Sequence, residues 1–272
     1  MDDSELRSSE ALDRVAARVK DLAKTYEPPG FAHVPDPDAA IFLCAVDHKT
    51  GYSKPHRVGG EGPYSGSELM WICGLRSAQA EPGLLTAERL RDASAAQVSE
   101  WFWADGETVA DPERRAELWR DLAAGLLRSH EGSAQILLNR AGGELAGRAG
   151  LIGRLRDYAA FSDPLGKKSF LFAKIAERRG WFRVRDPESW EVAADNVLMR
   201  LSLRSGMVSP GPLSEVRAET RKELKRLALA TGISPPVLDD MLWELGRDDP
   251  DLLGADAGKL DEPPREPGSA WY

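Results

Sequence analysis

The sequence predicts an all-α protein, and three observations support that class. Apolar residues recur at helical spacing through most of the 272 residues, as in the amphipathic segment from Ser4 to Tyr26. Several such segments open with residues that favour a helix start, such as Thr86 and the pair Asp111 and Pro112. No alternating pattern longer than a few residues predicts a strand, and no internal repeat is present.

The predicted helices follow one another along the chain with short connections. After the first helix, the stretch EPPGFAHVPDPD breaks the pattern with prolines and a glycine, and a short apolar run covers Ala39 to Val46. Gly232 is expected to end one late helix, and Pro235 to open the next. The remaining helices are expected over Glu68–Gln79, Thr86–Phe102, Pro112–Ser129, Ser133–Arg140, Leu151–Phe161, Ser169–Arg179, Ala194–Ser205, Leu213–Thr231 and Pro235–Gly246.

Composition limits the class of protein. With 42% apolar residues, the chain can bury one large core or two small ones. No run approaches the roughly 18 apolar residues of a membrane helix. The N-terminus is acidic and polar, unlike a signal peptide, so we expect a cytoplasmic protein with no membrane partner. Cys44 and Cys73 are too few for a disulfide framework and are expected to be buried thiols.

Charge is distributed unevenly. The net charge of −8 argues against nucleic acid, because neutralisation of phosphates drives most of that affinity. Between Arg128 and Arg185, however, twelve basic residues stand against five acidic ones. This segregation predicts either one basic face or basic residues scattered around several helices, and the sequence leaves both open.

The segment SDPLGKKSFLFAK, from Ser162 to Lys174, sets two lysines behind a Pro-Leu-Gly turn. The first backbone N–H groups of a helix favour an anion, so we expect Gly166, Lys167 and Ser169 to contact a phosphate. A lysine amine can also attack a sugar carbon if burial or a neighbouring cation lowers its pKa, and Lys167 supplies such a cation beside Lys168.

This turn resembles the hairpin of the helix-hairpin-helix DNA glycosylases, in which a Gly-x-Lys turn precedes the helix of a catalytic lysine and an aspartate follows on the next helix. Gly166, Lys167 and Lys168 fit the turn, and the segment AADNVLMRL supplies Asp195. A carboxylate there would stabilise the positive charge that builds on the sugar as an N-glycosidic bond breaks.

Residues 160–250 resemble the archaeal 8-oxoguanine DNA glycosylases most closely, through KSFLF from Lys168, ADN around Asp195 and the late stretch TGISPPVLDDMLWELGR. The resemblance implies Lys168 as the amine nucleophile and Asp195 as the supporting carboxylate. It implies Phe172 and Trp243 as the sandwich around an extruded base, with Asp239 at the edge of that base. The chain departs from the family where Ala-Ala and Asn-Val flank Asp195 in place of Pro-Val and Tyr-Arg.

We therefore expect a two-lobed helical bundle like that of the helix-hairpin-helix glycosylases. Residues 1–250 would form a single catalytic domain with a cleft between about 40–130 and 150–250. Residues 251–272 would form an extended C-terminal tail.

A second resemblance covers the N-terminal half. The queuosine salvage proteins, which are nucleoside hydrolases that release queuine, have a Tyr-Ser-Gly step before a Trp-containing helix, as in PYSGSELMWICGLRSA here. Their long helix before a Gly-Ser step is similar to DPERRAELWRDLAAGLLRSHEGSAQ. Where that family has an aromatic segment Asp-x-x-Asn-Phe-x-Phe-Trp, however, this chain has the polar residues from Asp47 to Lys54.

That polar stretch opens a loop of about twenty residues, DHKTGYSKPHRVGGEGPYSG, long enough to predict a function. Asp47 and Tyr52 are expected to contact the base, and Lys54 and Arg57 a backbone phosphate, with His48 and His56 at the same pocket mouth. Its polarity would suit a hydroxyl-rich modified base, such as a glucosylated pyrimidine of viral DNA. His33, His48 and His56 are irregularly spaced across loops, so no metal site is predicted.

The main hypothesis is an N-glycosylase that excises 8-oxoguanine or a hypermodified base from DNA to leave an abasic site, in DNA repair or antiviral defence. Whether it also has AP-lyase activity is left open. We expect a monomer with DNA as partner, no cofactor and no metal. One alternative is a hydrolase of queuosine or its 5′-monophosphate, and another is a DNA-binding hairpin protein without catalysis.

Overall fold

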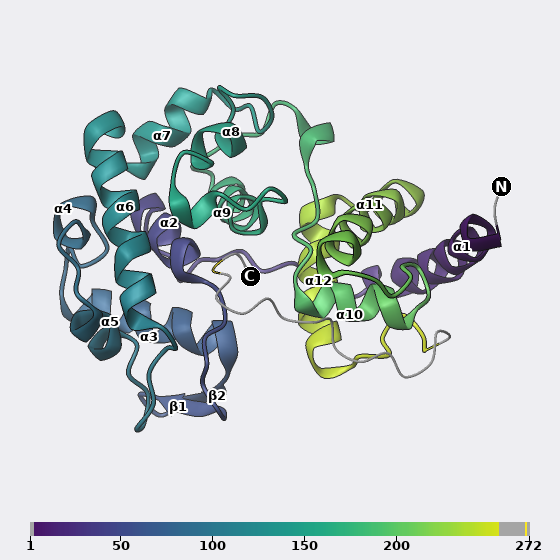
Figure 1. Ribbon diagram of the computed structural model, residues 1–272, viewed down its shortest axis with the longest axis horizontal. Coiled ribbons are helices and arrows are strands. Elements are labelled where there is room, and N and C mark those ends of the chain that lie inside the picture. Colours follow the sequence, from purple (N-terminus) through teal and green to yellow (C-terminus); the bar gives the residue numbers. More distant parts are fainter. Residues whose placement is uncertain (1–2, 256–269, 271–272) are drawn as a thin grey trace. The chain divides into compact units, whose positions relative to one another are not determined.

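The structure is a computed structural model that describes residues 3–255 and residue 270, with side chains from residue 10 onward (Figure 1). It is mostly helical, in agreement with the predicted class. A small antiparallel hairpin, β1 (His56–Val58) and β2 (Glu61–Tyr64), pairs His56 with Tyr64. No helix in these ranges is long and apolar enough to cross a membrane.

The chain divides into two units, each with its own buried residues. Unit 1 comprises Met1–Pro29 and Glu188–Ser269, and unit 2 comprises Gly30–Pro187 and Ala270–Tyr272. The expected lobes differ from this division, because residues 150–187 belong to the same unit as residues 40–130. The physical reason is that the helix after the lysine turn packs against the apolar run at residues 39–46.

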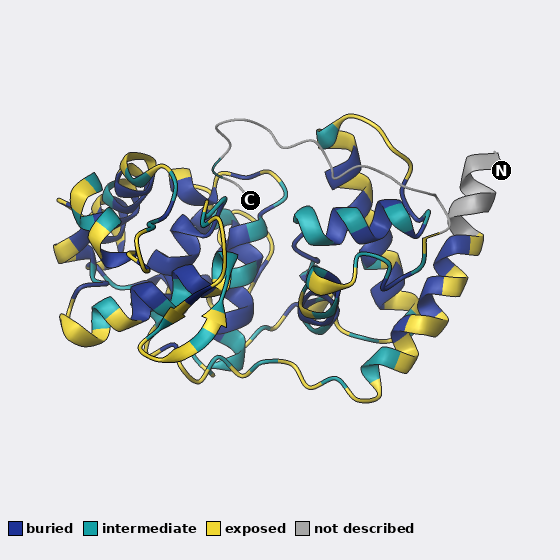
Figure 2. Cartoon of the chain, turned by 90° about the horizontal axis from the view of Figure 1, so that it is seen from below, coloured by how far each residue is buried: buried dark blue, intermediate teal, exposed yellow. Residues whose placement is uncertain are grey.

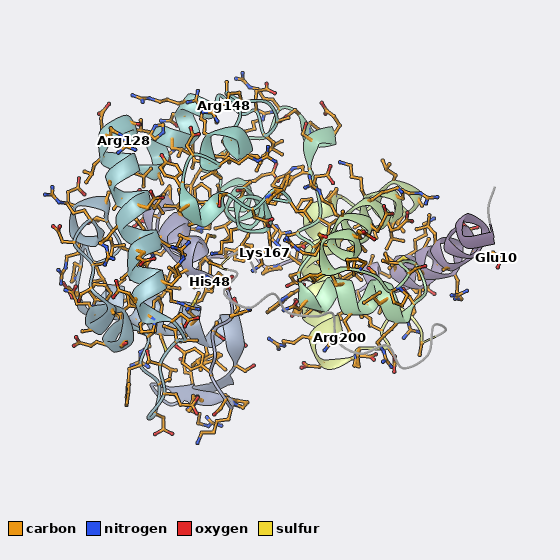
Figure 3. All side chains as sticks on the ribbon, in the orientation of Figure 1. Glu10, His48, Arg128, Arg148, Lys167 and Arg200 are labelled. Carbon is orange, nitrogen blue, oxygen red and sulfur yellow. The ribbon has the colours of Figure 1, made fainter. Side chains whose placement is uncertain are left out.

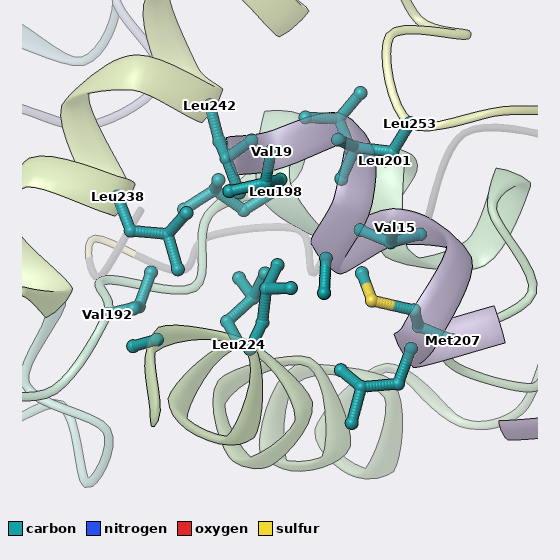
Figure 4. Close-up of a cluster of buried hydrophobic side chains, with 14 of the residues drawn as sticks. Val15, Val19, Val192, Leu198, Leu201, Met207, Leu224, Leu238, Leu242 and Leu253 are labelled. Carbon is teal, nitrogen blue, oxygen red and sulfur yellow. The ribbon is translucent and has the colours of Figure 1, made fainter. Parts of the chain in front are cut away.

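Unit 1 is a group of four helices around one apolar core. It contains α1 (Asp3–Ala23), α10 (Asn196–Arg204), α11 (Leu213–Thr231) and α12 (Pro235–Asp248). Figure 4 shows the core, in which Val15, Leu198 and Leu224 meet from three helices. Leu252 and Leu253 are buried in the same cluster, so ordered packing continues past residue 250. Most of the expected tail lies outside the described residues.

Unit 2 is built around a short helix that is buried along most of its length. This helix, α2 (Pro37–Val46), is opened by Asp36, whose carboxylate accepts from the Ala39 N–H at 2.8 Å. All residues from Ala39 to Val46 are buried. Figure 2 shows the buried residues of the chain in dark blue. Around it lie α3 (Gly66–Ala80), α4 (Ala87–Leu90), α5 (Ala95–Trp101), α6 (Pro112–His130), α7 (Ala134–Ala141), α8 (Leu151–Leu155) and α9 (Lys167–Arg178). Short 3-10 turns cover Ala159–Phe161 and, at the unit boundary, Pro187–Ser189.

Two predicted helices are each interrupted. The expected helix over Thr86–Phe102 is divided because Ser94 and Gln97 form a capping box that starts α5 afresh. The expected helix over Leu151–Phe161 ends at Leu155. Beyond it, the Ala159 N–H donates to the Asp121 carboxylate on α6 instead of continuing the helical ladder.

Leu224→Ala is expected to lower the free energy of unfolding by about 2 to 5 kcal/mol, because it opens a cavity in the core of unit 1. Leu229 lies on the same helix, but 76% of it is exposed, so Leu229→Ala is the matched control and should change stability by less than about 0.5 kcal/mol. Urea denaturation of both variants measures the difference. Equal effects would contradict the core assignment.

Candidate active site

The amine of Lys168 is buried inside unit 2. Gly166 adopts a left-handed conformation (φ 66°) that ends the turn and starts α9, which directs Lys168 towards the end of α2. Only 1% of Lys168 is exposed. Its Nζ donates to the Ala45 carbonyl at 2.6 Å and lies 3.1 Å from Nδ1 of His48. Burial of a single lysine in this way is rare and typical of a functional site.

Electrostatics favour the neutral form of this amine. Burial lowers the pKa of Lys168 well below its ordinary value, and the positive charge of Lys167 lowers it further. Burial together with the nearby Lys168 and Arg115 also lowers the pKa of His48, so its imidazole is neutral and can accept at Nδ1. A neutral amine has two N–H bonds and one lone pair. With Ala45 and His48 as its two acceptors, the lone pair is left for chemistry.

The second lysine of the turn is held by the residue before His48. Lys167 Nζ lies 3.8 Å from an Asp47 carboxylate oxygen and 3.4 Å from the Asp47 carbonyl oxygen. Asp47 also accepts from Ser67 Oγ at 2.5 Å and from Trp71 Nε1 at 3.3 Å. Burial alone would raise the pKa of Asp47, but Lys167, these two hydrogen bonds and Lys168 together lower it. Two consecutive lysines are thus matched to two consecutive residues of the loop.

Arg115 supports the loop, although no motif in the sequence indicates this role. Its buried guanidinium on α6 donates to the carbonyls of Ala110, His48 and Lys49. Burial lowers the pKa of Arg115 to about 10, which leaves it charged at neutral pH. The available signal was its position, since Arg115 precedes Leu118 and Trp119 on the apolar stripe of that helix.

The rest of the polar loop is tied to the segment after α5. The Tyr52 hydroxyl donates to the Phe102 carbonyl at 2.6 Å. Glu107 accepts from the Ser53 hydroxyl, accepts from the Ser53 N–H at 2.9 Å and lies 3.2 Å from His56 Nε2. These hydrogen bonds lower the pKa of Glu107 to about 2. Lys54 and Arg57, the predicted phosphate contacts, are exposed on the same loop.

The start of α9 already holds an anion. The carboxylate of Asp163, itself buried, accepts from the backbone N–H groups of Leu165 and Lys167, each at 3.1 Å. The predicted phosphate contact through this backbone is therefore replaced by an internal carboxylate at Lys167. Ser169 is fully buried, and its hydroxyl has no hydrogen-bond partner among the described residues.

Phe172, the predicted base-stacking residue, is fully buried on the apolar side of α9. Its contact with a base stays a prediction. The sequence pattern predicted an aromatic at this position but could not tell a core ring from an exposed one.

Asp195, Asp239 and Trp243, the predicted residues after Pro187, all lie in unit 1. Asp195 caps α10, and its carboxylate accepts from the Leu198 N–H at 3.1 Å. Asp239 is buried and accepts from the Ala193 N–H at 3.1 Å, which connects α12 to the segment before Asp195. Trp243 is half-buried with the Arg247 guanidinium 5.4 Å from its ring centroid. The catalytic role of Asp195 and the base contacts of Asp239 and Trp243 stay predictions.

Comparison with known protein families finds no family model that matches the chain, and no curated protein matches it significantly. Within the described ranges, no group of three or more His, Cys, Asp or Glu side chains is placed to hold a metal ion.

Lys168→Met is expected to stabilise the protein at pH 7 by about 1 kcal/mol, a gain typical of removing a strained functional group. The unfolded chain keeps the Lys168 proton up to a pH near 10.5, whereas the folded chain releases it at lower pH. Wild-type stability should therefore rise with pH between the two pKa values, and the advantage of the variant should shrink towards pH 10. Chemical denaturation across that pH range measures this. Lys222→Met, at an exposed lysine, is the control. Lower stability of Lys168→Met at every pH would contradict the assignment.

Proposed function

We propose that the protein is an N-glycosylase that releases a modified base from DNA, with the Lys168 amine as nucleophile. The observation that carries the proposal is the buried amine itself, which has a lowered pKa and two acceptors for its N–H bonds. An amine in this state can attack a carbon atom at neutral pH, whereas a solvated lysine is protonated and unreactive.

The chemical step follows from that geometry. The lone pair of Lys168 Nζ forms a bond to C1′ of the sugar, and the electrons of the N-glycosidic bond leave with the base, which takes a proton from water. The nitrogen then carries an extra proton, and His48 Nδ1, at 3.1 Å, relays it to the ring oxygen of the sugar as the C1′–O4′ bond breaks. Opening of the sugar ring gives an imine between C1′ and Nζ, and water hydrolyses this imine to leave the abasic site and the free amine. The role that the resemblance implies for Asp195, to stabilise the positive charge on the sugar, stays a prediction that the Asp195→Asn variant tests.

Two buried charges support this step without touching the substrate. The Asp47 carboxylate pairs with Lys167 Nζ at 3.8 Å and so holds this side chain beside the amine. Arg115 holds the carbonyls of His48 and Lys49, and so fixes the imidazole against the amine. We assign positioning roles to Asp47 and Arg115.

A second candidate function is hydrolysis of a free modified nucleoside or its 5′-monophosphate, as in the queuosine salvage proteins. The observation that favours it is the contact of Ser67 and Trp71 with Asp47. Both residues belong to the segment PYSGSELMW that carries the N-terminal resemblance, and Asp47 pairs with Lys167 of the turn. The two resembling segments thus meet at one group of side chains in unit 2.

Base release from a panel of substrates separates these functions. The panel comprises duplex DNAs with 8-oxoguanine, uracil, hydroxymethylcytosine or glucosylated cytosine, together with queuosine and its monophosphate, and mass spectrometry reads the free base. We expect release from one or more DNAs, a loss of at least about 10³-fold with Lys168→Gln, and a strong loss with Asp195→Asn. Borohydride should trap wild type, and not Lys168→Gln, as a covalent adduct with that DNA. Release from the small molecules alone would establish the second candidate, and no release from any substrate would remove both.

Variants at His48 test the proton acceptor. His48→Asn keeps an acceptor near the place of Nδ1, whereas His48→Leu has a similar volume and no acceptor. We expect a loss of about 10²-fold or more in the single-turnover rate of base release for His48→Leu, with partial recovery in His48→Asn. Circular dichroism checks that both variants are folded. Equal rates in both variants would show that the hydrogen bond to Lys168 has no part in the reaction.

A further inference from the structure

The charges of unit 2 are divided between its two parts. Residues 30–127 carry nine basic and fifteen acidic residues, whereas residues 128–187 carry twelve basic and six acidic ones. The second part includes the end of α6, all of α7, α8 and α9, and the segment up to Pro187. The positions of these basic residues in the structure decide whether they form one surface or are scattered around several helices.

Eight of them are arginines outside α9, and the elements that carry seven of these, all but Arg179 at the end of α9, are joined. The Arg185 N–H donates to the Gly143 carbonyl at 2.8 Å, and Asp186 accepts from the N–H groups of Leu145 and Ala146. The Gln135 side chain on α7 reaches the Trp181 carbonyl at 3.3 Å. We define the arginine surface as Arg128, Arg140, Arg148, Arg154, Arg156, Arg183 and Arg185.

Several of these arginines also act on the same titratable side chains, which indicates that they lie close to one another. The pKa of His130 is lowered by burial and by the charges of both Arg140 and Arg154. The pKa of Tyr158 is raised by burial to about 12, against the opposing charges of Arg128 and Arg154. The charge of Arg154 therefore acts on both His130 and Tyr158. Figure 3 shows Arg128 and Arg148 at the same end of unit 2, where α6, α7 and α8 meet.

Few of these charges are neutralised within the protein. Arg148 pairs with Asp157 at 2.9 Å and Arg140 with Glu131 at 3.8 Å. In the part of the chain that the structure describes, Arg128, Arg183 and Arg185 are exposed and have no ion pair. Arg154 and Arg156 donate to backbone carbonyls instead of carboxylates. The remaining N–H groups of these guanidinium groups can donate to an external anion.

The surface is continuous with the lysine turn. The guanidinium of Arg156 donates at 3.1 Å to the carbonyl of Pro164, which lies in the turn before Lys168. An anion that spans several arginines can therefore extend to the beginning of α9. A small nucleotide carries too few phosphates to occupy a surface of this extent.

We propose that the arginine surface binds the phosphate backbone of DNA alongside the base that is to be excised. All seven residues are arginines, whose planar guanidinium matches phosphate oxygens in a bidentate way that lysine does not. Their spread over three helices and a following segment suits a row of phosphates. The identity of the polyanion as DNA rests on the proposed function, whereas the surface and its charge do not.

The test compares two triple variants with the same change in charge. One replaces Arg128, Arg183 and Arg185 by Gln on the surface. The control replaces Arg89, Arg91 and Arg114 by Gln in the acidic part of unit 2. Each of these arginines is exposed and forms an ion pair with a carboxylate. Exposed ion pairs contribute little to stability. Binding of a fluorescent 20-base-pair duplex is measured from 50 to 300 mM salt. The surface variant should bind at least about tenfold more weakly, with a salt slope smaller by about 2 to 3, because each lost phosphate contact removes roughly 0.9. The control should match wild type.

Lys168→Gln in the same assay separates this inference from the proposed function. DNA binding that the surface variant loses and Lys168→Gln keeps supports the surface, even if no substrate releases a base. If the protein releases a base and both triple variants bind DNA as tightly as wild type, the surface proposal is overturned and the catalytic proposal stands. Equal weakening by the two triple variants would also overturn it, because net charge alone would then explain binding. Binding to heparin as tight as to DNA, with the same arginine dependence, would overturn the assignment to DNA.

Discussion

The burial of one amine against the end of α2 organises much of unit 2. Lys168 donates to the carbonyl of Ala45 in the last turn of that helix, where backbone carbonyls have no helical partner and the helix dipole favours a donor. Because α2 is apolar and buried along most of its length, the amine is removed from water there. The backbone carbonyl of Ala45 at the end of α2 is its polar partner on this helix. The loop after Val46 must then supply any further polar partners, and it does so with consecutive residues. His48 meets Lys168, and Asp47 meets Lys167.

The charges around this amine are unbalanced in a way that serves chemistry better than stability. The amine lies near the charges of Lys167 and Arg115 and near the buried carboxylate of Asp47. A buried pair of opposite charges would keep Lys168 protonated, whereas two cations and burial displace its proton. Arg115 avoids the cost of an unpaired buried cation by donating to three backbone carbonyls. The same contacts hold the loop in place, so one residue supports both the fold of the loop and the electrostatics of the amine.

Charge is also segregated on a larger scale within unit 2. Its acidic part carries surface arginines that pair with carboxylates, whereas the part from Arg128 onward has exposed arginines with few such partners. A negative net charge for the whole chain is therefore compatible with a local site for polyanions, since screening in salt limits the reach of each exposed charge to about 10 Å. The contact of Arg156 with Pro164 joins this surface to the turn that presents the lysines.

Local sequence signals determined the helical class and the turn at Gly166, because turns and helical periodicity act over a few residues. The helices expected from Ser169 and Ala194 begin at Lys167 and at Asn196, which Asp195 caps. Tertiary packing decided the rest. His48 and Ala45 lie more than a hundred residues from Lys168 in the sequence, and no local pattern pairs them with it. Packing also buried Phe172, placed Asp163 where a phosphate was expected and set residues 150–187 in the same unit as α2. Each of these outcomes depends on which apolar faces meet, and Arg115, a charged residue on such a face, shows that polarity alone does not predict the side on which a residue lies.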